Sequence, residues 1–260
     1  MKKGIKGELE KIKNEVMEAV FPSNIYCICC GSLIDSTRPY SLCDKCVREI
    51  HWIGSRTCEK CGKALPETYR GDLCYDCMTY AHDFHKGYSC FTYGLHEREL
   101  LFDFKYNNRR YLAGKFGDIL YDRISCENIH PDVIIPVPVS RSRMKKRGYN
   151  QSALLAKRLS ERWGVLADDG ILIRKKDTPP LRGLTPAERE AKLADAFAVA
   201  DGKTSKIAGK RVLLIDDIFT TGATASECGR ALREAGVSEL YFAALLNAAN
   251  RHHQQPDSYA

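Results

Sequence analysis

The 260-residue sequence lacks any long apolar run. Crossing a bilayer takes roughly 20 consecutive apolar residues, and no stretch approaches that length, so we expect no membrane span. The first residues, MKKGIKGELEKIKNEV, mix lysines with glutamates and lack an apolar centre, so we also expect no secretory signal. Both absences favour a cytoplasmic protein.

An apolar stripe at helical spacing lies within residues 1–22. It consists of Ile5, Leu9, Ile12, Val16 and Val20, and Pro22 ends it. The pattern predicts an N-terminal amphipathic helix over residues 1–22. We expect this stripe to dock on the rest of the protein, with a membrane surface or a partner helix as the alternative.

Cysteine, in contrast, is abundant. Twelve cysteines in a chain without an export signal indicate reduced thiols and metal ligation rather than disulfides. Eight of them form four C-x₂-C pairs, and the second two pairs repeat the first two with a shift of 31 residues. The eight candidate ligands are Cys27, Cys30, Cys43, Cys46, Cys58, Cys61, Cys74 and Cys77. The repeat predicts a duplicated zinc-binding domain over residues 23–82.

Two structural Zn²⁺ ions are the expected occupants, with iron–sulfur clusters as the alternative. Eight thiolates saturate two tetrahedral ions and leave no open position for water, which favours a structural role over a catalytic one. The spacing leaves open whether consecutive pairs or crossed pairs share an ion. Cys29 lies between two ligands and is a doubtful member of the first set, whereas Cys90, Cys126 and Cys228 are expected to be buried apolar residues.

Positive charge is concentrated in one short run. The formal net charge of +7 falls to about +3 if each Zn(Cys)₄ centre contributes −2, so the overall charge is a weak argument for nucleic-acid binding. Residues 141–147 hold five cations and no acid, namely Arg141, Arg143, Lys145, Lys146 and Arg147. Such a run suits an anionic ligand, a nucleic-acid strand or a solvated face.

The second half of the chain alternates apolar strand patterns with helix patterns. Strands are expected at 132–139, 171–173, 212–216 and 240–247, and helices at 151–163 and 224–235. This order predicts an α/β domain with a parallel sheet over residues 85–250, followed by a polar tail over 251–260. Ligands of such sheets bind at the carboxyl ends of the strands.

The run from Arg211 to Thr224, RVLLIDDIFTTGAT, carries most of the chemistry. Four apolar residues predict a strand buried on both faces, which the two acids end. A small-residue turn before a helix forms a phosphate cradle from backbone N–H groups and the helix dipole. The acids can accept hydrogen bonds from sugar hydroxyls or hold Mg²⁺ through water. Capping of the following helix is the simpler alternative.

The segment LLIDDIFTTGAT resembles the signature of the type I phosphoribosyltransferases, which bind phosphoribosyl pyrophosphate. The resemblance implies a phosphoribosyltransferase type I fold. It places Asp216 and Asp217, the catalytic pair, at the ribose 2′ and 3′ hydroxyls. It places the 5′-phosphate on Thr220, Thr221, Gly222, Ala223 and Thr224.

A second stretch, IIPVPVSRSRMKKRGYNQS, is similar to the ComF family of competence proteins (ComFC- and GntX-like proteins). Those proteins also place paired-cysteine zinc motifs ahead of a phosphoribosyltransferase domain. The family's motifs occur here in the same order across nearly all of residues 24–248. The resemblance implies a role in DNA uptake during natural transformation.

The phosphoribosyltransferase resemblance also assigns the pyrophosphate to the loop after the first sheet strand. By position this loop is Pro138, Val139, Ser140 and Arg141, with Arg147 nearby. Cations there would stabilise the charge that develops on a leaving pyrophosphate. Lys105 follows an apolar run and is either a phosphate ligand or a surface lysine with a buried stem.

The same resemblance places residues 178–185 over the active site. Many relatives carry glutamine where this chain has Leu181 and asparagine where it has Lys192. These departures leave the phosphoribosyl site intact and the recognition of the acceptor open.

The function expected from the sequence is therefore a phosphoribosyltransferase. It would bind Mg²⁺ and phosphoribosyl pyrophosphate, transfer the phosphoribosyl group to an unidentified acceptor and release pyrophosphate. The alternative is a non-catalytic competence factor that binds single-stranded DNA and the DNA-uptake machinery, with the ribosyl site used for ligand sensing. A purely structural zinc adaptor leaves residues 216–224 unexplained. The oligomeric state stays open.

Overall fold

The computed structural model describes residues 24–178 and 183–248 and divides into two compact units. The first unit ends at Glu49 and the second begins at Ile50. The predicted N-terminal helix, the C-terminal tail and Leu181 lie outside the described residues.

The first unit is a small loop structure built around its cysteines. Its only regular elements among residues 24–49 are the 3₁₀ turn η1 (Pro39–Ser41) and helix α2 (Asp44–Glu49). A tight turn bonds Gly31 N–H to Cys27 C=O at 2.9 Å, and a bridge joins Tyr26 to Leu33. Among residues 24–49 the buried apolar side chains are Ile28, Leu42 and the cysteines Cys27 and Cys46, so we expect a bound metal to stabilise this part of the chain.

The second unit opens with a copy of the same loop. Gly62 N–H bonds Cys58 C=O at 2.9 Å, and a bridge joins Thr57 to Ala64. Helix α3 (Tyr75–Thr79) takes the place of α2. The backbone therefore repeats along with the cysteine spacing.

A four-stranded sheet with all strands parallel forms the centre of the second unit, in the order β1-β6-β5-β2. The strands are β1 (Lys86–Thr92), β2 (Val133–Pro136), β5 (Arg211–Phe219) and β6 (Glu239–Asn247). Residues 212–215 are fully buried, as the apolar run predicts. The strand does not end at the two acids, however, because β5 stays paired with β6 as far as Phe219.

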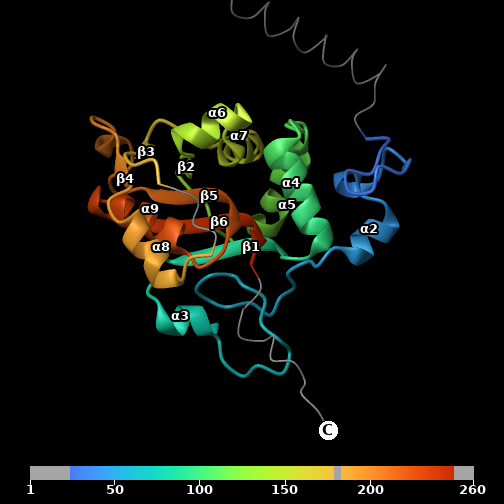
Figure 1. Cartoon of the computed structure of the whole chain (residues 1–260), viewed down its shortest axis with the longest axis horizontal. Coiled ribbons are helices and arrows are strands. Elements are labelled where there is room, and N and C mark those ends of the chain that lie inside the picture. The colour runs from blue at the N-terminus through green and yellow to red at the C-terminus, as the bar shows by residue number, and fades with distance from the viewer. Residues whose placement is uncertain (1–23, 179–182, 249–260) are drawn as a thin grey trace, which may run out of the picture. The chain divides into compact units, whose positions relative to one another are not determined.

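Helices cover both faces of this sheet (Figure 1). Helices α5 and α7 pack on one face, and α9 packs on the other. The helices of this layer structure are α4 (Leu95–Tyr106), α5 (Leu112–Ser125), α6 (Arg141–Arg147), α7 (Gln151–Trp163) and α9 (Ala223–Glu234). Helix α7 has the predicted bounds, whereas none of the sequence patterns above predicts α5 or α6.

The predicted strand at 171–173 lies outside the main sheet. It is β3 (Leu172–Arg174), which pairs antiparallel with β4 (Phe197–Val199) in a separate two-stranded sheet. Between them, α8 (Pro186–Leu193) begins at a capping box of Thr185 and Glu188, and the 3₁₀ turn η2 (Thr204–Lys206) follows β4. No helix among the described residues is long and apolar enough to cross a membrane.

Candidate functional site

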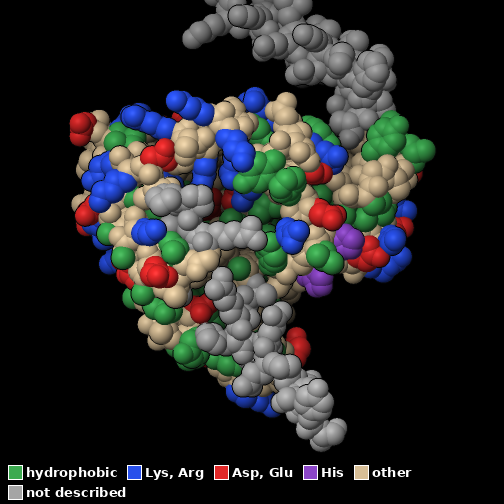
Figure 2. Space-filling view, viewed as in Figure 1, with side chains coloured by type: hydrophobic (Ala, Val, Ile, Leu, Met, Phe, Trp, Pro, Cys, Tyr) green, Lys and Arg blue, Asp and Glu red, His purple; other side chains and the backbone are tan. Residues whose placement is uncertain are grey.

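A cavity of about 550 Å³ opens at the carboxyl ends of β2 and β5, where the parallel sheet is expected to bind ligands. Figure 2 shows Lys and Arg side chains around this hollow. Its charged lining comprises the cations Lys105, Arg143, Lys146, Arg147, Arg174 and Arg189 and the acids Asp216 and Asp217. Six cations against two acids make the cavity suited to a strongly anionic ligand.

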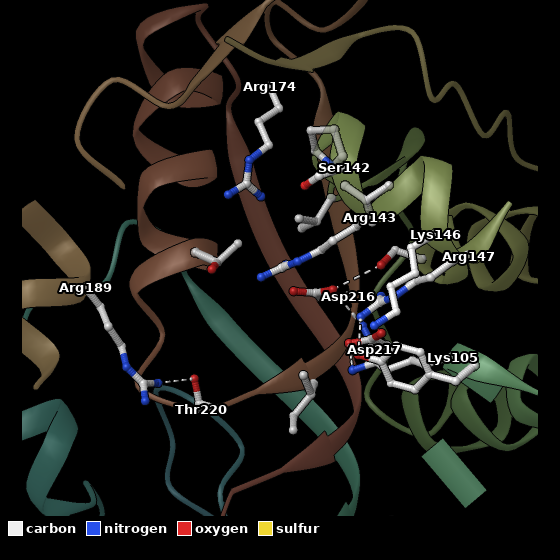
Figure 3. A pocket seen from close by; sticks show the side chains of 17 residues that line it. Lys105, Ser142, Arg143, Lys146, Arg147, Arg174, Arg189, Asp216, Asp217 and Thr220 are labelled. Atoms are coloured by element: carbon white, nitrogen blue, oxygen red, sulfur yellow. Dashed lines mark hydrogen bonds and ion pairs between the residues drawn. The ribbon is translucent and has the colours of Figure 1, made fainter. Parts of the chain in front are cut away.

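The two acids lie side by side but have different partners (Figure 3). Asp217 forms an ion pair with Lys105, with Nζ and Oδ1 2.9 Å apart. Asp216 Oδ1 accepts hydrogen bonds from the Ser152 hydroxyl at 3.0 Å and from the backbone N–H of Asp217 at 2.8 Å. One acid is thus neutralised by a cation, while the other is held only by dipoles.

This difference shows in the ionisation of Asp216. Burial, and next the neighbouring charge of Asp217, raise the pKa of the Asp216 carboxyl from 3.8 to about 7. The Asp217 N–H, Lys105 and Ser152 oppose the rise. The Asp216 carboxyl therefore holds its proton up to near-neutral pH, and a ligand that donates hydrogen bonds or brings a cation favours its ionised form.

Lys105 is partly buried in the wall of the cavity. Its side chain is 14% exposed and lies in the cavity wall against Asp217, on the last turn of α4. This burial argues against the alternative of a surface lysine with a buried stem. Its expected role as a phosphate ligand stays a prediction, since its ammonium group contacts the acid.

The predicted phosphate loop surrounds the start of α9. Gly222 has φ of +81° and precedes the first helical residue, Ala223, so the chain turns sharply into the helix. Thr220 and Thr224 line the main cavity, whereas Thr221 and Ala223 line a second cavity of about 100 Å³ behind it. The five predicted residues thus lie together, but four of them line two different cavities.

Arg189, a residue that no sequence motif singled out as a ligand, closes this loop from α8. Its guanidinium donates from Nη1 to Thr220 Oγ1 at 3.0 Å and from Nε to the Leu184 carbonyl at 3.1 Å. The side chain is buried and lines the main cavity. A cation beside the loop adds to its preference for a dianion such as phosphate.

The predicted pyrophosphate loop reaches the cavity only in part. Pro138 and Val139 line it, and Ser140 caps α6 by accepting from the Arg143 N–H at 3.3 Å. Arg141 is exposed and lines a separate groove beside β3 instead. The basic run forms the short helix α6, which turns Arg143, Lys146 and Arg147 toward the cavity.

Arg174 is a further cavity residue that sequence reasoning missed. It leaves β3, bonds the Thr178 hydroxyl and the Lys176 carbonyl, and reaches into the cavity opposite the acids (Figure 3). Burial, and then the charge of Arg143, lower the pKa of its guanidinium. Two cations held this close to each other favour an anionic ligand between them.

An exposed aromatic pair lies next to the cations at the cavity mouth. Phe102 and Tyr106 on α4 are 54% and 45% exposed, and their ring centroids are 4.9 Å apart. Lys146 and Arg147 lie over the Tyr106 ring at 5.5 and 5.1 Å. Figure 2 shows hydrophobic side chains directly beside basic ones in this region. We call these four residues the aromatic–basic ledge; only the fold reveals it, because α4 and α6 are far apart in sequence.

The eight predicted metal ligands form two separate clusters of four. Consecutive pairs come together, so the crossed pairing is excluded: one cluster is Cys27, Cys30, Cys43 and Cys46, and the other is Cys58, Cys61, Cys74 and Cys77. In each cluster one sulfur–sulfur distance between the pairs is 3.7 Å. Zinc bonded to four sulfurs at about 2.3 Å in a tetrahedron separates them by about 3.8 Å. The geometry therefore fits Zn²⁺ at both clusters.

Backbone N–H groups support the same interpretation. Cys43 N–H points to Cys27 Sγ at 3.4 Å, and Cys74 N–H points to Cys58 Sγ at 3.2 Å. Such hydrogen bonds stabilise thiolate ligands. Both clusters thus have the donor set of a closed structural zinc site.

Comparison with known proteins matches both parts of the chain. Residues 16–78 match the double zinc ribbon domain, and residues 112–260 match the phosphoribosyl transferase domain. Competence protein F of Haemophilus influenzae is 31% identical over 222 residues, which cover 84% of this chain and 94% of that protein. Competence protein ComFC of Bacillus subtilis is 27% identical over 207 residues, which cover 75% and 79%. DNA utilization protein YhgH of Escherichia coli K12 is 25% identical over 204 residues, which cover 76% and 87%.

Solved structures give more distant matches. A glutamine phosphoribosylpyrophosphate amidotransferase from B. subtilis, complexed with ADP and GMP, is 21% identical, with 54% of this chain and 30% of that chain covered and a TM-score of 0.38. An adenine phosphoribosyl transferase from Trypanosoma brucei is 13% identical, with coverages of 59% and 75% and a TM-score of 0.35. From the match to Competence protein F and the two domain matches, the chain belongs to the ComF family of competence proteins, with a double zinc ribbon ahead of a phosphoribosyltransferase domain.

Proposed function

We propose that the protein binds phosphoribosyl pyrophosphate with Mg²⁺ and transfers the phosphoribosyl group to an acceptor, releasing pyrophosphate. One observation carries the proposal: the acid pair Asp216–Asp217 and the loop residues Thr220 and Thr224 line one cavity whose remaining charged lining is cationic. Phosphoribosyl pyrophosphate combines a diol, a phosphate and a pyrophosphate, which are the groups that these three parts of the cavity suit.

Each part of the cavity has a role in this proposal. The ribose hydroxyls donate to Asp216 and Asp217, and the 5′-phosphate accepts from backbone N–H groups of the loop before α9. The pyrophosphate lies against Arg143 and its neighbours on α6. Asp216 and Asp217 are also the carboxylates that would hold Mg²⁺ through water, and the ion would neutralise part of the charge on the pyrophosphate.

The chemistry follows from charge stabilisation. The bond between the ribose C1 and the pyrophosphate oxygen breaks, pyrophosphate leaves with the electron pair, and the acceptor bonds to C1 and gives up a proton. Cations fixed beside the leaving group stabilise the negative charge that develops there. No covalent protein nucleophile is required, so orientation and electrostatics supply the acceleration.

The names of the relatives suggest the setting. Two are competence proteins and one is a DNA utilization protein. We therefore place the activity in the uptake or use of DNA during natural transformation. Cysteine-rich zinc sites need reduced thiols, which favours the cytoplasm.

The aromatic–basic ledge favours a second candidate function, the binding of single-stranded DNA. Exposed rings stack on bases, and the adjacent cations pair with phosphates, as in general single-strand binders. In this version the ribosyl site senses its ligand without turnover. Phe102 and Tyr106 would supply the stacking surface, and Lys146 and Arg147 the charge.

Isothermal titration with phosphoribosyl pyrophosphate, with and without Mg²⁺, tests the first function. Changing both Asp216 and Asp217 to Ala removes charged hydrogen bonds of roughly 1.5–3 kcal/mol each and should weaken binding at least about 100-fold. Asp201→Ala, an exposed acid in a turn away from the cavity lining, is the control. Equal affinity in the double variant would overturn the assignment.

Fluorescence anisotropy with a labelled oligothymidylate tests the second candidate function, the binding of single-stranded DNA. Phe102→Ala with Tyr106→Ala should weaken binding at least about tenfold, because each stacked base contributes about 1–3 kcal/mol. Tyr75→Ala changes an equally exposed tyrosine on α3 and should leave binding unchanged. Equal loss in both variants, or no loss in either, would remove the ledge from the DNA surface.

A further inference from the structure

His82 lies directly behind the loop 220–224, although it belongs to the segment that follows the second cysteine cluster. Its ring is 8% exposed and stacks on Phe84, with centroids 5.2 Å apart and planes at 9°. The His82 ring also meets the ring of Phe219, the last residue of β5, in an edge contact with centroids 5.8 Å apart. Its Nδ1 lies 2.9 Å from the Ser226 hydroxyl on α9. The imidazole therefore contacts both ends of the loop.

The loop itself packs against the ring. A Cβ atom at Gly222 would overlap the imidazole of His82, so the glycine is needed for the close approach as well as for its φ of +81°. Further along α9, a Cβ at Gly229 would overlap the carbonyl of Asp83. Residues 82 and 83 thus fix the position of α9 at two points.

The other edge of the ring faces the same region. His82 Nε2 and Thr221 Oγ1 are buried and have no hydrogen-bond partner among the described residues. Both side chains line the cavity of about 100 Å³ behind the loop. Nothing in the ribosyl chemistry proposed above uses these groups.

The position of His82 is set by the second cysteine cluster. Lys60, between Cys58 and Cys61, donates to the carbonyl of Phe84, and Gly87 N–H bonds Lys60 C=O at 2.8 Å. Cys58, Cys61 and Cys74 share one buried apolar cluster with Phe84 and Phe219; Cys58 and Cys61 are 0% and 1% exposed. The loops that carry the second cysteine cluster therefore fix the position of the segment that contains His82.

We propose that His82 is a positioning residue for the phosphate loop. Through His82, the second cysteine cluster holds the loop in the conformation that binds the 5′-phosphate. The inference rests on the proposed function, since it gives the loop its ligand. The loop's N–H groups must converge on one point to bind phosphate. Without the ring, Gly222 gains free space on one side, and glycine is the residue least able to hold a conformation by itself.

Two ligands separate this role from general destabilisation. Ribose 5-phosphate probes the loop and inorganic pyrophosphate probes the opposite wall of the cavity, both by isothermal titration of the zinc-loaded full chain. His82→Ala should weaken ribose 5-phosphate at least about tenfold and change pyrophosphate affinity less than twofold. His82→Asn places an amide atom where Nδ1 lies and keeps the bond to Ser226, so it should recover at least half of the lost binding energy.

His85→Ala is the matched control. This histidine is three residues away and exposed, and its Nδ1 accepts a hydrogen bond from Leu240 N–H at 2.8 Å, but it does not contact the loop. It should lower the melting temperature without changing ribose 5-phosphate affinity. Hydrogen exchange of residues 218–226 provides a second readout, which His82→Ala should accelerate and His85→Ala should not.

The outcomes are distinct. If the wild-type protein binds neither ribose 5-phosphate nor phosphoribosyl pyrophosphate, the proposed function falls and this inference falls with it. If the wild-type protein binds both and His82→Ala binds equally well, or loses both probe ligands in parallel, only the positioning role is overturned. If the His82→Ala protein does not fold, the His82→Asn protein decides. Normal ribose 5-phosphate affinity of His82→Asn, together with accelerated hydrogen exchange in residues 218–226, would also contradict the positioning role.

Discussion

The acid pair in the second half of β5 should cost the ligand-free protein stability, and Asp216→Asn should recover it. Asparagine keeps an acceptor oxygen for the Ser152 hydroxyl and the Asp217 N–H but carries no charge. The pKa of Asp216, raised by burial and then by Asp217, stands at about 7 in the folded protein against an ordinary 3.8. Between these values the folded state holds a proton that the unfolded state has lost.

The sign and size of the effect follow from this difference. A raised carboxyl pKa contributes stability that is complete below pH 3.8 and is lost as the pH rises to about 7. Each pH unit corresponds to about 1.36 kcal/mol, so the two units between pH 5 and 7 correspond to about 2.7 kcal/mol. Water in the open cavity screens part of the charge and lowers this figure. We therefore expect the difference in unfolding free energy between Asp216→Asn and wild type to be about 1.5–2.5 kcal/mol larger at pH 8 than at pH 5.

Thermal melts of both proteins at pH 5 and pH 8, without ligand or Mg²⁺, measure this directly. For a unit of this size about 1 kcal/mol shifts the melting temperature by about 2–4 °C, so the advantage of the variant should grow by about 3–10 °C at the higher pH. Titrating groups away from residue 216 are common to the two proteins and cancel in the difference. If Asp216→Asn melts below wild type at pH 8, or if its advantage in melting temperature is the same at both pH values, the folded protein does not hold the extra proton on Asp216.

Three further predictions concern the metal and the cations. Metal analysis should give two zinc ions per chain. Cys46→Ser should lose one ion without lowering the melting temperature of the second unit. Cys58→Ser should also lose one ion but should lower that melting temperature, because Cys58 lies in the core shared with the sheet. Arg174→Ala should weaken phosphoribosyl pyrophosphate about 10- to 100-fold by titration, and Arg174→Lys should lose less, since a charged hydrogen bond contributes about 1.5–3 kcal/mol. If the ledge binds DNA, Lys145→Ala with Lys146→Ala should flatten the dependence of log affinity on log salt by about one unit or more, measured by anisotropy; an unchanged slope would move the DNA surface elsewhere.

The parts of the fold that sequence predicts well are those specified by local pattern. Residues 212–215 form an uninterrupted apolar run and become the buried centre of β5, and α7 keeps its predicted bounds because Asn150 caps its start and Gly164 its end. The cysteine spacing likewise predicts eight ligands. Which cysteines share an ion depends on how the loops fold back, so the consecutive pairing emerged only from the structure.

The parts that sequence missed depend on contacts between distant segments. Arg174 enters the cavity because β3 pairs with β4, a strand 23 residues later, and no local signal marks that pairing. The Lys105–Asp217 ion pair joins α4 to β5. In the aromatic–basic ledge, the aromatic pair on α4 meets the basic run only because α4 packs near α6. The basic run itself contains no apolar stripe, so its helical state in α6 follows from the Ser140 cap and the Gly148 stop rather than from periodicity.

Calorimetric titration of the zinc-loaded wild-type protein with phosphoribosyl pyrophosphate tests the central claim most directly. We expect saturable binding of one molecule per chain, which strengthens when Mg²⁺ is added and which ribose 5-phosphate and pyrophosphate each compete away. Absence of heat up to millimolar phosphoribosyl pyrophosphate in the presence of Mg²⁺ would contradict it.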